Sequence, residues 1–226
     1  FQYQYLNFKN FILKKIFKKS IIISLSFILF FCENKKIELP IYGIPIVNSK
    51  TLENGSISYD TLDHMIQNFK LFNQNGKIIT NETLKHKIYI ADFFFTSCPS
   101  ICRKMQRNLF YVYKTYEDNS NVSFVSHTID PKNDTVEKLK EYSENLEVDD
   151  EKWHFLTGDL DQIYNLGENS YMVAAKEEEK APGGFLHGSS FLLVDKERRI
   201  RGVYDGTSRI ETNRLIIDIN HLINSY

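Results

Sequence analysis

Cysteine is scarce in this chain, and its scarcity limits the metal sites that the chain can form. Only three cysteines occur among 226 residues, and Cys98 and Cys102 are the one closely spaced pair. A structural zinc site uses four protein ligands, commonly from two such pairs. No second pair is present, so zinc is disfavoured, and the third cysteine, Cys32, lies far from the pair in the sequence.

A surplus of positive charge is also absent. The 28 basic and 29 acidic residues give a formal net charge of −1, but residues 1–32 hold five lysines and no acid. Without that segment, 23 basic residues stand against 29 acidic ones, a net charge of −6. Because phosphate binding needs a basic face, no nucleic acid is expected as a partner. The length and a hydrophobic content of 42% suit one globular domain with extensions.

The N-terminal apolar run is too short to span a membrane as a helix. Ile21–Phe31 has eleven residues, whereas a spanning helix needs about 20. The run follows a lysine-rich stretch and precedes Cys32, which resembles a bacterial lipoprotein signal with Cys32 as the lipidated residue. Phe31 stands where a small residue is usual, and an uncleaved signal anchor is the alternative. Both interpretations predict a bacterial cell-envelope protein, anchored to the cytoplasmic membrane with its domain on the oxidising periplasmic or outer side.

Three regions are expected: a signal segment (1–32), a tether and lead-in interrupted by proline and glycine (33–64), and one folded domain (65–226). Within the domain, apolar runs and turn signals predict strands over 88–95, 122–128 and 153–156, and hairpins over 66–80 and 190–204. Helices are expected after Cys98, Asp134 and Asp159 and over 209–224, with Asp134 as the N-cap of the second and an exposed loop at 174–185. In the first helix, apolar residues recur at helical spacing and predict a buried face: Met105, Leu109, Val112 and Tyr116. This order predicts an α/β, thioredoxin-like fold with a mixed central sheet flanked by helices and an N-terminal β-hairpin extension.

The cysteine pair is the strongest chemical signal in the domain. Cys98 and Cys102 follow an apolar strand and are expected to open a helix, whose free N–H groups favour thiolate over thiol. Residues four apart lie on one helical face, so the two sulfurs can share a metal ion or close to a disulfide. Thioredoxin redox motifs have two intervening residues, whereas this pair has three. Two thiolates and one imidazole suit copper, as Cu(I) or Cu(II).

Histidine provides the candidates for a third ligand. His187 follows the Pro182–Gly184 segment, where a loop can carry an imidazole to a metal and withdraw it. His127 ends a predicted strand at the sheet edge that faces the cysteines, and is a candidate for contact with a ligand rather than with the metal. The other histidines are expected at the surface or in the core: His64, His86, His154 and His221.

Four longer segments resemble the Sco/SenC family of copper-binding proteins for cytochrome c oxidase assembly. They are ADFFFTSCPSIC (91–102), SHTIDPKNDTVEKLKEY (126–142), WHFLTGD (153–159) and FLHGSSFLLVDKERRIRGVYDG (185–206). The resemblance implies a thioredoxin fold that binds copper through Cys98, Cys102 and His187. It also implies delivery of copper to the binuclear site of oxidase subunit II, or reduction of that site's cysteines. A copper donor and a thiol reductant would be further partners.

Two positions depart from the family pattern. Arg103 replaces the usual proline after the second cysteine and is a candidate for tuning the thiolates, and Leu186 replaces a common aspartate before the histidine. The alternative function is an enzyme, a thiol–disulfide oxidoreductase in which Cys98, expected to be the exposed cysteine, attacks and Cys102 resolves. A peroxide-reducing enzyme is disfavoured, because no threonine or serine and arginine can be assigned around a single reactive cysteine. Copper binding requires both cysteines reduced, so the pair is also a redox switch.

Overall fold

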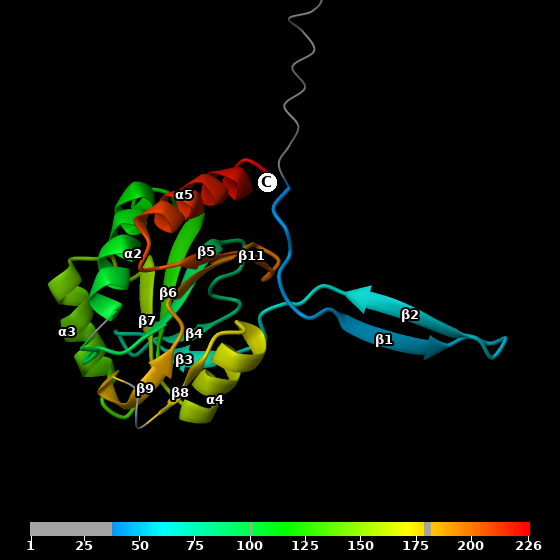
Figure 1. Cartoon of the computed structure of the whole chain (residues 1–226), viewed down its shortest axis with the longest axis horizontal. Helices are drawn as coiled ribbons and strands as arrows, with labels where there is room; N and C mark the ends of the chain where they lie inside the picture. The colour runs from blue at the N-terminus through cyan, green and yellow to red at the C-terminus, as the bar shows by residue number, and fades with distance from the viewer. Residues whose placement is uncertain (1–37, 100, 179–181) are drawn as a thin grey trace, which may run out of the picture. The chain divides into compact units, whose positions relative to one another are not determined.

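A five-stranded mixed sheet organises the domain (Figure 1). The computed structural model describes residues 38–99, 101–178 and 182–226. The sheet has the strand order β11-β10-β5-β6-β7, in which β5, β6 and β7 are parallel and β10 pairs antiparallel with both β5 and β11. Its strands are β5 (Ile88–Phe94), β6 (Val122–Thr128), β7 (Trp153–Leu156), β10 (Ser190–Val194) and β11 (Ile200–Asp205).

The centre of the sheet is buried on both faces. Every residue of β5 and β6 is buried, and successive side chains of a strand point to opposite faces, so packing covers both sides. The run of aromatic and β-branched residues in β5 is typical of such a central strand. The three predicted sheet strands and the hairpin of β10 and β11 are therefore confirmed.

Helices and short turns enclose the sheet: α2 (Cys102–Tyr116), α3 (Val136–Leu146), α4 (Leu160–Asn165), a π-helical turn (Leu166–Ser170) and α5 (Arg209–Ile223). The predicted apolar face of α2 is confirmed, since Met105, Leu109, Val112 and Tyr116 are all buried. The helix α5 packs against α2 and β11. A helix opens at Asp159 as predicted, and Asp159 caps α4 by accepting a hydrogen bond from the Gln162 N–H. The α/β fold with a mixed sheet flanked by helices is thus confirmed.

The predicted N-terminal hairpin is present as β3 (Lys70–Phe72) and β4 (Ile78–Thr80). It joins the domain beyond β7, where Phe72 and Thr157 exchange two backbone hydrogen bonds. The lead-in contains a further hairpin of exposed residues, β1 (Ile46–Thr51) and β2 (Ile57–Leu62). Before it, the Tyr42 N–H donates to the Ile200 carbonyl, so part of the lead-in is fixed to β11.

The predictions for residues 174–185 and for the cap of α3 are wrong. Residues 174–185 are not only a loop, because β8 (Ala175–Glu177) pairs antiparallel with β9 (Phe185–His187). Asp134 does not cap α3; Thr135 does so, by accepting a hydrogen bond from the Lys138 N–H. The carboxylate of Asp134 instead accepts hydrogen bonds from Thr96, in the loop before Cys98.

The predicted signal segment, with its apolar run and Cys32, lies outside the described residues. Within the described part of the chain, no helix combines the length and the apolar character needed to cross a bilayer.

Candidate metal centre

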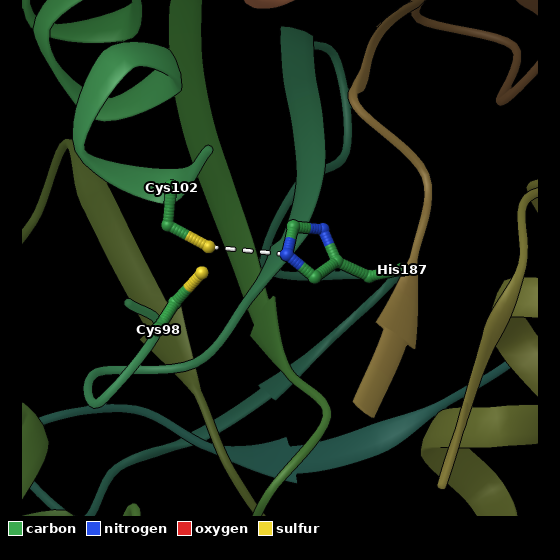
Figure 2. A group of neighbouring side chains, drawn as sticks. All are labelled: Cys98, Cys102 and His187. Carbon is green, nitrogen blue, oxygen red and sulfur yellow. Dashed lines mark hydrogen bonds between the residues drawn. The ribbon is translucent and has the colours of Figure 1, made fainter. Parts of the chain in front are cut away.

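Cys98, Cys102 and His187 come together at one end of the sheet (Figure 2). One ligand atom from each residue lies within 4.8 Å of the others. The Cys102 Sγ is 3.1 Å from the His187 Nε2, and both cysteines are present as thiols. Figure 2 shows the two sulfurs facing each other, with the imidazole directed toward Cys102. This is the set of three residues predicted from the sequence.

The two cysteines occupy different kinds of backbone. Helix α2 begins at Cys102, not after Cys98 as predicted. Cys98 lies in the preceding turn, where its N–H donates to the Phe95 carbonyl. A residue before proline is disfavoured in the helical region, and Pro99 follows Cys98, which fits the position of Cys98 outside the helix. Both cysteines are equally buried, at 7% exposure, so the predicted greater exposure of Cys98 is not observed.

His187 is the last residue of β9 and not part of a free loop. Its strand pairs with β8, where His187 lies opposite Ala175. The turn before β9 requires a glycine, because Gly183 has a φ of +82° and a Cβ there would lie 2.8 Å from the Phe95 ring. The same Phe95 ring meets the His187 imidazole edge to face, with the ring centroids 5.8 Å apart. Close packing at Gly183 thus helps to hold the imidazole beside the cysteines.

The hydrogen bonds of His187 define which ring nitrogen can bind a metal. The Nδ1 lies 3.0 Å from the Gly188 carbonyl oxygen, which can only accept, so Nδ1 carries the proton. In the neutral ring this leaves Nε2 with its lone pair toward Cys102. A backbone partner on the far nitrogen is the usual way in which proteins orient a metal-binding histidine.

Burial dominates the electrostatics of the Cys102 thiol. Loss of solvent raises the pKa of the Cys102 thiol, and the neighbouring Cys98 raises it further. The thiolate form of Cys102 is therefore disfavoured in the metal-free protein. A soft cation that binds both sulfurs must displace their protons, so binding releases protons to solvent.

Asp92 is a buried acid near the site that was not predicted. It lies within the apolar run of β5 and lines a small cavity together with Cys102 and Ser126. The Ser126 hydroxyl donates to its carboxylate and accepts a hydrogen bond from the Trp153 indole. Burial raises the pKa of Asp92 to about 6. An aspartate inside an otherwise apolar strand was the available signal.

Asp134 holds the loop that carries Cys98. Its buried carboxylate accepts hydrogen bonds from the Thr96 N–H, the Thr96 hydroxyl and the Thr128 hydroxyl. Thr96 precedes Cys98 by two residues, and Thr128 ends β6. The carboxylate therefore ties the loop after β5 to the end of the neighbouring strand.

Removing this carboxylate should destabilise the fold. In Asp134→Ala the three donors lose their acceptor, and an unsatisfied buried donor costs about 1–3 kcal/mol. We expect Asp134→Ala to lower the free energy of unfolding in urea by about 3 kcal/mol. The exposed Asp118 provides a control, because Asp118→Ala should change the free energy by less than about 0.5 kcal/mol. Equal effects of the two substitutions would contradict the role given to Asp134.

His127 lies in the core rather than beside the solvent edge of the site. It is fully buried between aromatic rings, stacked on Phe93 with centroids 5.0 Å apart and in contact with Phe69 and Tyr171. Among the described residues, neither ring nitrogen has a hydrogen-bond partner. Burial lowers the pKa of His127 to about 3, so the ring is neutral in the folded protein.

His127 should make the fold sensitive to acid. Its folded pKa lies below the value of about 6.5 in an unfolded chain, so stability is lost as the pH falls from about 6.5 toward 3. Between pH 7 and pH 5 this loss amounts to about 2 kcal/mol. In His127→Phe that loss should disappear, while the loss from His154, whose pKa burial also lowers, remains in both proteins. Urea unfolding at the two pH values measures the difference; equal losses would contradict it.

The other predicted residues do not join the cluster. Arg103 is exposed on α2, His64 hydrogen-bonds the Ser170 carbonyl, and His154 is buried beside Asn73. Cys32 lies outside the described residues.

The fold and the cluster define a class of protein: a thioredoxin-like domain with a cysteine–cysteine–histidine set suited to a soft metal ion. Residues 58–224 match the model of the SCO1/SenC family. The SCO1 protein homolog of Bacillus subtilis (strain 168) is 30% identical over 162 residues, which cover 71% of this chain and 83% of that relative. The chain therefore belongs to the SCO1/SenC family.

Solved structures of the family have the same fold. A SCO1/SenC family lipoprotein from Bacillus anthracis superposes with a TM-score of 0.65 at 31% identity, over 71% of this chain and 95% of that one. BsSco, a cytochrome c oxidase assembly protein with a disulfide switch, gives 0.63 at 29% identity, over 70% and 93%. Arabidopsis thaliana ScoI with copper bound gives 0.60 at 26% identity, over 72% and 99%.

Proposed function

We propose that this chain binds one copper ion through Cys98, Cys102 and His187. The observation that carries the proposal is the convergence of three ligand atoms within 4.8 Å. Thiolates are soft ligands that favour Cu(I), and the imidazole extends the set toward Cu(II). Three ligands leave an open edge from which another protein can take the ion. The copper-bound ScoI relative supports copper over other soft metals.

We infer that the copper is cargo for cytochrome c oxidase assembly, with the binuclear copper site of subunit II as its recipient. Membership of the family supports this role, because its member BsSco is a cytochrome c oxidase assembly protein. A copper donor would load the site. Because copper needs both thiols, a thiol reductant would be required whenever the oxidising compartment has closed the Cys98–Cys102 disulfide.

The adjacent thiols favour a second candidate, a thiol–disulfide oxidoreductase. The Cys98 thiolate would attack a disulfide of the partner and form a mixed disulfide while one partner thiolate leaves. Cys102 would then attack Cys98, which closes the intramolecular disulfide and releases the second partner thiolate. The disulfide switch of BsSco supports this alternative. The two roles use the same sulfurs but differ in their need for His187.

We propose a cell-envelope location on the outer side of the cytoplasmic membrane. The lysine-rich, apolar start of the sequence and Cys32 support a signal segment with lipid attachment, as does the description of the Bacillus anthracis relative as a lipoprotein. Residues 33–64 would then link the anchored end to the copper-binding domain, residues 65–226.

Two parallel assays distinguish the candidates. In the first, copper-loaded protein is mixed with the reduced, copper-free domain of subunit II, and copper transfer is measured. In the second, copper-free reduced protein is mixed with the oxidised domain, and the new partner thiols are counted. A copper carrier should succeed in the first assay and lose that activity in His187→Ala. Success in the second assay alone, with His187→Ala fully active, would establish the oxidoreductase instead.

A further inference from the structure

Basic side chains gather on the outer face of α2, next to the metal-ligand cluster. Arg103, Lys104 and Arg107 follow Cys102 within the first two turns, and all three are exposed. The first turn contains no acidic residue. Cations near a helix N-terminus oppose the helix macrodipole. The stability of α2 therefore does not account for these residues.

The start of α5 extends this basic face. The Arg209 guanidinium stacks over the ring of Tyr111, 3.3 Å from its centroid, and thus joins α5 to the second half of α2. The next residue, Ile210, is 79% exposed. Arginine, tyrosine and exposed apolar side chains are the mixture that protein interfaces favour. We name these six residues the α2–α5 surface: Arg103, Lys104, Arg107, Tyr111, Arg209 and Ile210.

The cations of this surface are not neutralised within the described part of the chain. None of the salt bridges there involves Arg103, Lys104, Arg107 or Arg209. Two acids lie near this surface. Asp205 accepts hydrogen bonds from Thr207, and these bonds, together with the charge of Lys104, lower the pKa of its carboxyl group. Glu211, in the first turn of α5, pairs with Arg214. The chain after residue 32 has a net charge of −6. The α2–α5 surface carries positive charge and is therefore opposite in sign to the net charge of the domain.

We propose that the α2–α5 surface docks an acidic, carboxylate-rich face of the protein that exchanges copper with the cluster. The proposal rests on the copper-exchange function proposed above. Direct exchange requires the partner's ligands to reach the copper, so docking has to occur beside Cys98 and Cys102. Guanidinium groups pair with carboxylates through two parallel hydrogen bonds. Complementary charge then raises the rate of encounter more than the affinity for copper.

An anionic lipid surface is the competing occupant. Its phosphates would also pair with arginine and lysine. A bilayer lying on this face would, however, block the approach of a second protein to the start of α2, where Cys102 lies. A protein partner is compatible with both the charge and the position of the surface.

Stopped-flow transfer of Cu(I) to the copper-free domain of subunit II tests the proposal. Measurements at ionic strengths of about 0.01 M and 0.15 M change the screening length from about 30 to about 8 Å. The wild-type second-order rate constant should fall at least tenfold with salt, the range expected for electrostatic steering. The combined Lys104→Gln, Arg107→Gln and Arg209→Gln variant should be roughly tenfold slower at low salt and nearly insensitive to salt. Arg103 stays unchanged because it adjoins Cys102.

A matched control removes three positive charges from other elements. Lys50→Gln, Lys70→Gln and Lys85→Gln alter exposed residues of β1, β3 and the β4–β5 connection, and this combination should transfer copper like the wild type. Competition with a Cu(I) chelator checks that both variants bind copper equally. Transfer from the basic-surface variant at the wild-type rate and salt dependence would overturn the docking surface and leave the proposed function intact.

Two other outcomes count against the proposal. Loss of binding to phosphatidylglycerol vesicles in the basic-surface variant, with unchanged copper transfer, would assign the surface to lipid. Failure of the wild type to load copper, or to transfer it to subunit II, would contradict the proposed function itself, and the docking surface with it.

Discussion

Replacing either Cys98 or Cys102 by serine is expected to lower the affinity for Cu(I) more than a hundredfold. A hydroxyl is a hard donor that stays protonated at neutral pH, whereas Cu(I) selects soft thiolates. Changes to residues that only touch a ligand already cost about 10–100-fold, so loss of a thiolate, the ligand type that Cu(I) selects, should cost more. Competition with a chromogenic Cu(I) chelator, under anaerobic reducing conditions, measures the affinity.

Cys32 supplies the matched control for this experiment. Cys32→Ser changes a cysteine of the same chain that is assigned to the signal segment, and it should leave the copper affinity unchanged. Serine is close to cysteine in size, so the variants should fold, which unfolding in urea can verify. Near-wild-type Cu(I) affinity in Cys98→Ser or Cys102→Ser would contradict the assignment of these ligands.

His187→Ala is expected to separate the two oxidation states of copper. Cu(II) relies on the imidazole nitrogen more than Cu(I) does. We therefore expect Cu(I) affinity to fall roughly tenfold, and Cu(II) affinity to fall at least tenfold more, with a change in the thiolate-to-Cu(II) absorption band. Titration of each ion, followed by absorption spectroscopy, gives both values.

His221→Ala is the control for the histidine substitution. His221 lies in the last turn of α5 and is not part of the cluster, so its loss should change neither affinity. An unchanged Cu(II) affinity together with an unchanged Cu(II) absorption spectrum in His187→Ala would exclude the imidazole as a ligand.

The elements that could be predicted from the sequence are those with a local signal. Strand β5 is a run of aromatic and β-branched residues, and the β3–β4 hairpin contains the turn Asn73–Gly76. Each of these signals lies within a few consecutive residues and predicts its element. The β8–β9 hairpin could not be predicted, because its charged and glycine-rich sequence is typical of a loop. Its two strands are stabilised by pairing with each other and by the close packing of Gly183 against Phe95.

The residues of the candidate site could likewise be predicted only where the sequence carries a local signal. The Cys98–Cys102 pair follows from spacing and its place after β5. His187 lies 85 positions after Cys102, and its prediction as a ligand rested mainly on the resemblance to the family. The environment of the site is set by the fold: burial raises the pKa of Cys102, and Asp134 ties down the loop rather than capping α3.

X-ray absorption at the copper edge, on the reduced protein loaded with Cu(I), tests the central claim most directly. Metal analysis of the same sample gives the copper content of the chain. We predict one copper per chain, with two sulfur neighbours and one nitrogen neighbour, and loss of the nitrogen neighbour in His187→Ala. A copper ion without two sulfur neighbours, or a spectrum that is unchanged in His187→Ala, would contradict binding by Cys98, Cys102 and His187.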